Sequence, residues 1–271
     1  MTIVSTDWLN VNLNKVRIVD ASWHLVKNRN AIEEYNKEHI ENAVFFNLDK
    51  NSNQKKNLSH GHFLPTINSH EKSISEMGIV NSDRIIIYCY SDLISSCRAW
   101  FQFLYFGHDP KLVSILNGGM KKWKLEDRKV TNLKTKIIPS KYKAMENNSM
   151  IKVKSQIDEN IKNKSFTVVD GRSKNRFLGL EPEPRPGIKS GSIEGSKSLP
   201  ISKLVNAKDN TFLDKKKLND IFNLKGINTN KIVMSCGSSV SASSLALAYS
   251  LINDDYMAKI YIGSWTEYGK K

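Results

Sequence analysis

The sequence has few cysteines and no long apolar segment. Cys89, Cys97 and Cys236 match no disulfide framework and no metal-ligand spacing, so we expect a reducing compartment, the cytoplasm, and no metal site. The absence of any run of about 18 apolar residues excludes a membrane-spanning helix. The opening residues MTIVSTDWLN lack the basic and apolar regions of a signal peptide. We therefore expect an ordinary globular protein with no membrane partner.

Arginine is also scarce. Only eight of the 41 basic residues are Arg, although the net charge is +14. Such a charge can indicate a nucleic-acid partner. Here the lysines are spread along the whole chain without interleaved aromatic residues, which favours a solvated surface, and we expect no nucleic acid. Arg172, Arg176 and Arg185 nevertheless lie in one short stretch, and the forked guanidinium group suits carboxylate binding.

What the sequence does contain is an internal repeat. Four segments of the first half recur in the same order about 150 residues later. The pairs are VRIVDASW with FTVVDGRS, EHIENAVFFNL with GSIEGSKSLPI, RIIIYCYS with KIVMSCGS, and LVSILNGGMKKW with AKIYIGSWTEYG. Each half alternates short β-branched runs with helical patterns, which predicts an α/β fold with a mostly parallel sheet flanked by helices. We expect domains at 1–130 and 149–271, joined by a linker at 131–148.

The repeat containing Cys236 has the form of a strand, a loop and a helix. KIVMS is the expected strand, CGSSVS the loop, and the helix is expected from about Ala242, with one buried face at Leu245, Ala248, Tyr249 and Ile252. Small residues let the loop amides point inward as an anion cradle, which would lower the thiol pKa from about 8.5 to roughly 3.5–7.5. From the loop alone, simple packing of Cys236 at the strand end is an alternative.

The loop and its flanking motifs resemble those of the two-domain sulfurtransferases of the rhodanese family. The motifs are VDASWHL, SSCRAWFQFLYFGH and LNGGMKKW in the first half, and RFLGLEPEPRPG, CGSSVSA and GSWTEYG in the second. The resemblance implies two tandem rhodanese-like domains, of which the second is catalytic. The loop is closer to the Cys-Gly-Ser-Gly-Val-Thr-Ala of 3-mercaptopyruvate sulfurtransferases than to the Cys-Arg-Lys-Gly-Val-Thr-Ala of thiosulfate sulfurtransferases.

The resemblance also implies the substrates and the residues that handle them. Cys236 would take a sulfur from 3-mercaptopyruvate as a persulfide, release pyruvate, and pass the sulfur to an acceptor thiol, such as thioredoxin or a small thiol, or to cyanide. Arg176 and Arg185 would bind the donor, together with the loop residues Gly237, Ser239, Val240 and Ser241. No metal or organic cofactor is implied.

Proton transfer in this family needs a hydroxyl, a histidine and a carboxylate. The resemblance assigns these roles to Ser238, His62 and Asp49. His60 is a rival to His62, but only His62 fits the family pattern His-x-Leu-Pro. Since the resemblance places the histidine and the carboxylate in the first domain, we expect both halves to be needed.

Some positions depart from the family pattern and keep other functions open. Ser239 replaces a family Gly, which would cost about 1–2 kcal/mol if the position requires a positive φ. Cys89 aligns with Cys236, but the bulk of Tyr90 and Asp92 argues against a cradle there. A cysteine phosphatase needs Cys-x5-Arg and is disfavoured, because the sixth residue after Cys236 is Ala242. Thiosulfate sulfurtransferase and a non-catalytic sulfur-carrier or binding module stay open.

Overall fold

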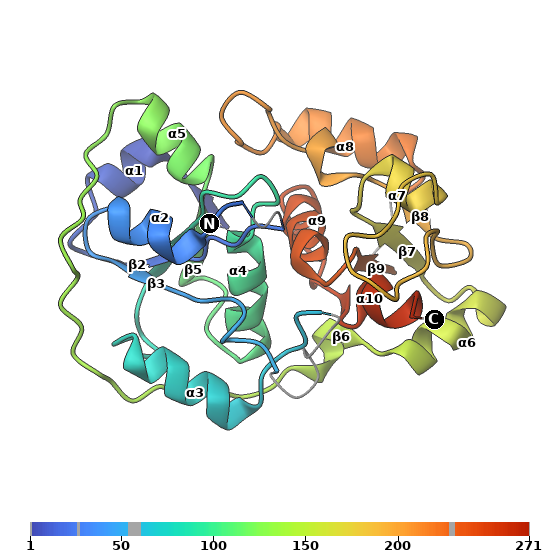
Figure 1. The fold of residues 1–271 in the computed structure, drawn as a ribbon, viewed down its shortest axis with the longest axis horizontal. Helices are drawn as coiled ribbons and strands as arrows, with labels where there is room; N and C mark the ends of the chain where they lie inside the picture. Colours follow the sequence, from blue (N-terminus) through green and yellow to red (C-terminus); the bar gives the residue numbers. More distant parts are fainter. Residues whose placement is uncertain (1, 26–27, 54–60, 228–230, 271) are drawn as a thin grey trace. The chain divides into compact units, whose positions relative to one another are not determined.

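A computed structural model describes residues 2–25, 28–53, 61–227 and 231–270 (Figure 1). The chain divides into two compact units. Within the described ranges, no helix combines the length and the apolar character needed to cross a membrane.

The first unit comprises Met1–Ser52, Pro65–Asn147 and Asn206–Phe212. Its five strands form a fully parallel sheet in the order β1-β5-β4-β2-β3. The strands are β1 (Ile3–Val4), β2 (Arg17–Asp20), β3 (Ala43–Phe45), β4 (Ile85–Tyr88) and β5 (Val113–Leu116). The helices are α1 (Thr6–Asn10), α2 (Ala31–Lys37), α3 (Ile67–Glu76), α4 (Ser96–Tyr105) and α5 (Gly119–Leu125).

The second unit comprises Asn53–Leu64, Asn148–Val205 and Leu213–Lys271. Its strands are β6 (Ile151–Lys152), β7 (Thr167–Asp170), β8 (Lys197–Ser198), β9 (Ile232–Ser235) and β10 (Ile260–Tyr261). Its helices are α6 (Lys154–Asn163), α7 (Lys174–Leu178), α8 (Lys215–Leu224), α9 (Val240–Ser250) and α10 (Ser264–Tyr268), with 3-10 turns at Asn148–Met150 and Ile201–Lys203. The parallel order β6-β10-β9-β7-β8 repeats that of the first unit strand for strand. The predicted α/β fold and duplication are therefore confirmed.

Helix α9 differs from its prediction. It begins at Val240, two residues earlier than expected, and every residue from Val240 to Tyr249 is buried. The expected single buried face is therefore wrong. The helix contacts β9, β10, α8 and the 3-10 turn at Ile201–Lys203, so it is surrounded by the core of its unit.

The bounds of the two units also differ from the expected domain bounds. The predicted linker 131–148 belongs to the first unit up to Asn147: Thr131 pairs with His39, and the Asn147 amide donates to Tyr105 at 2.8 Å. Residues 53–64, which carry His62, belong to the second unit instead of the first. Backbone groups of connecting segments need hydrogen-bond partners, and here the fold supplies them in places that local sequence does not reveal.

Candidate active site

Cys236 follows directly after β9, at the carboxyl end of the second sheet. The loop Cys236–Ser239 leads into α9, whose first residues are Val240 and Ser241. The backbone amides of Ala242 and Ser238 act to lower the pKa of the Cys236 thiol. The loop thus stands at the N-terminus of α9, the place where the sequence predicts an anion cradle.

The ionisation of Cys236 differs from the expectation. Burial raises the pKa of the thiol, while the Ala242 amide and, more weakly, the Arg176 charge oppose this rise. Cys236 is only 2% exposed. Removal of water from the thiolate therefore raises the pKa more than the amide dipoles lower it. The predicted lowering of the pKa is therefore wrong for the protein alone, in which the thiol form is favoured.

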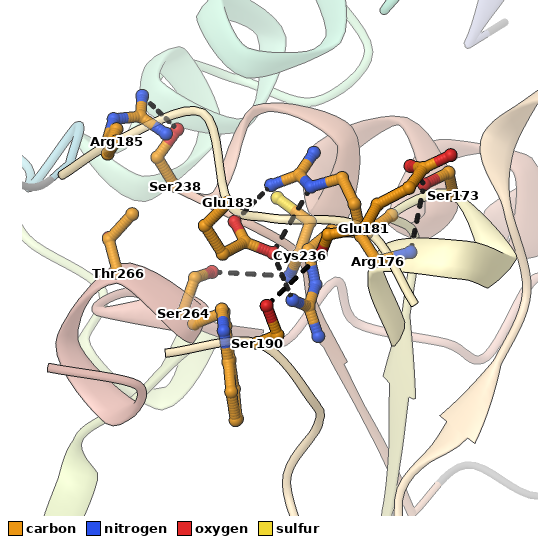
Figure 2. A network of polar contacts seen from close by, with 12 residues as sticks. Ser173, Arg176, Glu181, Glu183, Arg185, Ser190, Cys236, Ser238, Ser264 and Thr266 are labelled. Carbon is orange, nitrogen blue, oxygen red and sulfur yellow. Dashed lines mark hydrogen bonds and ion pairs between the residues drawn. The ribbon is translucent and has the colours of Figure 1, made fainter. Parts of the chain in front are cut away.

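Ser264 and Ser239 hold the loop in shape. The Ser264 hydroxyl accepts a hydrogen bond from the amide of Cys236 at 3.4 Å (Figure 2). It also accepts one from the amide of Ser239 at 3.1 Å and donates to the Tyr261 carbonyl. Ser239 has φ +63°, the left-handed conformation in which a Gly would be unstrained. Its hydroxyl lies 2.7 Å from the Ser238 carbonyl and 3.3 Å from that of His62, which compensates part of the strain.

Gly237 is the point on which the two predicted donor-binding arginines converge. A Cβ atom placed on Gly237 would lie 3.1 Å from Arg176 Nη2 and 3.8 Å from Arg185 Nη1. Arg176 comes from α7, and Arg185 comes from the Pro-rich loop that follows it. In Figure 2 the Arg176 guanidinium lies beside the Cys236 sulfur. The missing side chain at Gly237 thus leaves space for two guanidinium groups next to Cys236.

Arg176 belongs to a buried ion-pair network. One member of this network, Glu183, could not be singled out from the sequence. Arg172 binds Asp170 and Glu183, and Glu183 binds Arg176 as well. Arg172 also lies over the Trp265 ring at 4.8 Å. Through these contacts Arg172 and Asp170 brace the loop. Glu183 stands in the motif RFLGLEPEPRPG, but nothing in its spacing distinguishes it from Glu181.

His62 reaches Ser238 within the second unit. Its Nδ1 atom lies 3.1 Å from Ser238 Oγ, to which Arg185 Nη2 also donates at 3.2 Å. Gly61 makes this approach possible, because a Cβ there would lie 2.9 Å from Thr266 Oγ1. The rival His60 lies outside the described residues. Asp49 belongs to the first unit, where it is exposed and accepts a hydrogen bond from Trp23 Nε1 at 3.1 Å. Its catalytic role stays a prediction.

Cys89 occupies the position in the first unit that Cys236 occupies in the second. It follows β4 directly, is buried, and receives backbone hydrogen bonds from Ser96 and Ser91. The expectation that Tyr90 and Asp92 would prevent a cradle there stays a prediction. Burial raises the pKa of this thiol too, and the cavity that Cys89 lines has a volume of only about 10 Å³.

Two parallel sheets in one strand order, with a cysteine loop entering a helix, define the fold of rhodanese-like domains. The rhodanese-like domain family matches residues 5–126 and 153–271, and the chain belongs to that family. A thiosulfate/3-mercaptopyruvate sulfurtransferase of Arabidopsis thaliana is 34% identical over 98% of this chain and 83% of its own. The 3-mercaptopyruvate sulfurtransferase of Homo sapiens is 32% identical, over 98% and 91%. SseA of Escherichia coli, described as a 3-mercaptopyruvate sulfotransferase, superposes with a TM-score of 0.86 at 27% identity, over 98% and 99%.

Proposed function

We propose that the protein is a sulfurtransferase that moves a sulfur atom from 3-mercaptopyruvate, through a persulfide on Cys236, to a thiol or cyanide. The observation that carries this proposal is the convergence of Arg176 and Arg185 on Gly237, next to the buried nucleophile. The names of the full-length relatives support the same reaction class.

The donor is a small keto acid with one carboxylate. A charge-assisted contact between a guanidinium and a carboxylate contributes about 1.5–3 kcal/mol, and the fork also fixes the orientation of the bound group. Thiosulfate sulfurtransferases carry Arg and Lys where this chain has Gly237 and Ser238. A Cβ atom at Gly237 would lie 3.1 Å from Arg176 Nη2, so a side chain there would require Arg176 to shift. This favours 3-mercaptopyruvate over thiosulfate.

The first half-reaction needs no external proton. The Cys236 sulfur attacks the donor sulfur, an S–S bond forms, and the C–S bond breaks with its electron pair going to carbon as an enolate. The thiol releases one proton and the enolate carbon takes up one proton, so the two balance. Cys–SH and 3-mercaptopyruvate therefore yield Cys–S–SH and pyruvate.

Ser238 and His62 are suited to carry that proton. A serine hydroxyl accepts up to two hydrogen bonds and donates one. With Arg185 donating to Ser238 Oγ and His62 within 3.1 Å, the hydroxyl proton can move to the enolate carbon and be replaced from the imidazole. The proton that the Cys236 thiol releases then restores the imidazole. The proposal includes the role that the family resemblance implies for Asp49, which is to supply the carboxylate in this proton transfer.

In the second half-reaction an acceptor removes the outer sulfur. A thiol gives R–S–SH and cyanide gives thiocyanate, and Cys–SH is regenerated in both cases. Thioredoxin or a small thiol is the proposed acceptor. The low cysteine content supports a cytoplasmic location, although one similar protein is mitochondrial by name.

A donor assay tests the proposal. Pyruvate release from 3-mercaptopyruvate in the presence of a thiol is expected, faster than thiocyanate formation from thiosulfate and cyanide. Transfer from thiosulfate without pyruvate release would make the protein a thiosulfate sulfurtransferase, which the names of its relatives also suggest. Turnover of neither donor would indicate a sulfur-carrier module.

A further inference from the structure

We propose that Glu183 is a positioning residue that fixes Arg176 and makes the donor site selective for singly charged donors. The inference rests on the proposed function. Glu183 contacts two arginines instead of the reacting sulfur, so it acts on the donor through Arg176.

Glu183 is a buried carboxylate, and both of its oxygens accept hydrogen bonds from arginines. Its side chain is 1% exposed, and Oε1 accepts from Arg172 Nη1 at 2.7 Å and from Arg176 Nε at 3.2 Å. Oε2 accepts from Arg176 Nη2 at 2.5 Å. The Nε–Nη2 edge of Arg176 is thus held by two bonds, which fixes the plane of the guanidinium where Nη2 faces Gly237.

Arg172, the other arginine that binds Glu183, is held by further contacts of its own. Arg172 binds Asp170 through Nε and Nη2, at 2.8–3.1 Å, and donates from Nη2 to the Gly191 carbonyl at 2.8 Å. Both side chains are nearly fully buried, at 1% and 2% exposed. Arg172 is therefore a rigid support from which Glu183 can hold Arg176.

The charges of this network cancel. Asp170 and Glu183 are negative, Arg172 and Arg176 are positive, and the four are joined in the order Asp170–Arg172–Glu183–Arg176. Arg176 therefore offers the donor a fixed hydrogen-bonding surface without its full positive charge. Because interactions between buried charges are poorly screened, a doubly charged donor gains less from such a site than it would from an uncompensated arginine. A keto-acid carboxylate needs only one charge to be balanced.

Glu183→Gln tests this inference, since it retains the size of the side chain and removes one negative charge. We expect the ratio of kcat/KM for 3-mercaptopyruvate to that for thiosulfate to fall at least tenfold, through a higher KM for the keto acid and a lower KM for thiosulfate. Glu181→Gln is the matched control in the same loop: Glu181 is exposed and accepts from Asn175 at 3.0 Å, and its ratio should be unchanged. An equal loss for both donors in Glu183→Gln would mean a merely structural role and overturn the inference.

A measurement on the unaltered protein covers the case in which Glu183→Gln does not fold. Pyruvate, a monoanion, should compete with 3-mercaptopyruvate at a lower concentration than sulfate, a dianion of similar size. Stronger competition by sulfate would overturn the inference. Absence of any pyruvate release by the unaltered protein is a separate result, because it would refute the proposed function itself.

Discussion

The Nδ1 atom of His62 lies 3.1 Å from the hydroxyl oxygen of Ser238, a residue 176 positions further along the chain. Both belong to the second unit, since the segment that carries His62 folds there and not with the sheet that precedes it in the sequence. This contact connects the loop that follows Cys236 to an imidazole, a group able to move protons.

His62→Ala should slow pyruvate release by about 10²–10⁴-fold, because general acid–base catalysis contributes on that scale. Sulfur transfer from thiosulfate requires no protonation of carbon, so it should fall much less. Steady-state assays with the two donors measure the difference. Equal loss with both donors would remove His62 from the proton path.

Arg185→Ala should raise the KM for 3-mercaptopyruvate by roughly 10- to 100-fold, which corresponds to the loss of one charge-assisted contact. The effect on thiosulfate should be much smaller. Arg17, whose side chain is 54% exposed and pairs with Asp83, provides the control Arg17→Ala, for which neither KM should change. Equal changes for both donors in Arg185→Ala would contradict a carboxylate clamp.

Gly61→Ala should reduce pyruvate release by displacing His62. The new methyl group would meet Thr266 Oγ1 at 2.9 Å, and Thr266 is itself held by a hydrogen bond to the Gly263 carbonyl. Adding Thr266→Ala should restore part of the rate by making room. Full activity in the single variant would show that the close approach of residue 61 is not needed.

Asp20→Asn should change the pH dependence of stability. Burial raises the pKa of Asp20 from 3.8 to about 6, against hydrogen bonds from Ser22. The folded protein thus binds the proton more tightly than the unfolded chain, and stability is lost as the pH rises from about 4 to about 6. Asn keeps the oxygen that accepts from Ser22, so this loss should disappear, with a gain of at most about 3 kcal/mol at pH 7.

Urea unfolding at pH 4.5 and pH 7 measures this effect. Asp170→Asn serves as a contrast, because Asp170 is paired with Arg172 and its neutralisation should destabilise the protein at pH 7. A parallel pH dependence in Asp20→Asn and the unaltered protein would contradict the assignment.

Local sequence was sufficient to predict the duplication and the position of Cys236 between a strand and a helix. Both depend on patterns within a few residues and on comparison of the two halves. The direction of the Cys236 pKa shift was not predictable in this way, because desolvation depends on everything that packs over the loop.

The supporting residues of the site could not be recognised from the sequence either. Glu183 and Glu181 stand in the same Pro-rich motif, and only the fold decides which of them is buried between arginines. Ser264 and Gly61 act through contacts with loops far away in the chain. Such roles follow from tertiary packing, not from residue type or spacing.

The mass of the intact protein after incubation with 3-mercaptopyruvate alone tests the central claim most directly. One additional sulfur atom should appear on the unaltered protein and on Cys89→Ser, with a stoichiometric release of pyruvate, and neither should occur with Cys236→Ser. Pyruvate release without added sulfur, or sulfur retained in Cys236→Ser, would contradict a persulfide on Cys236.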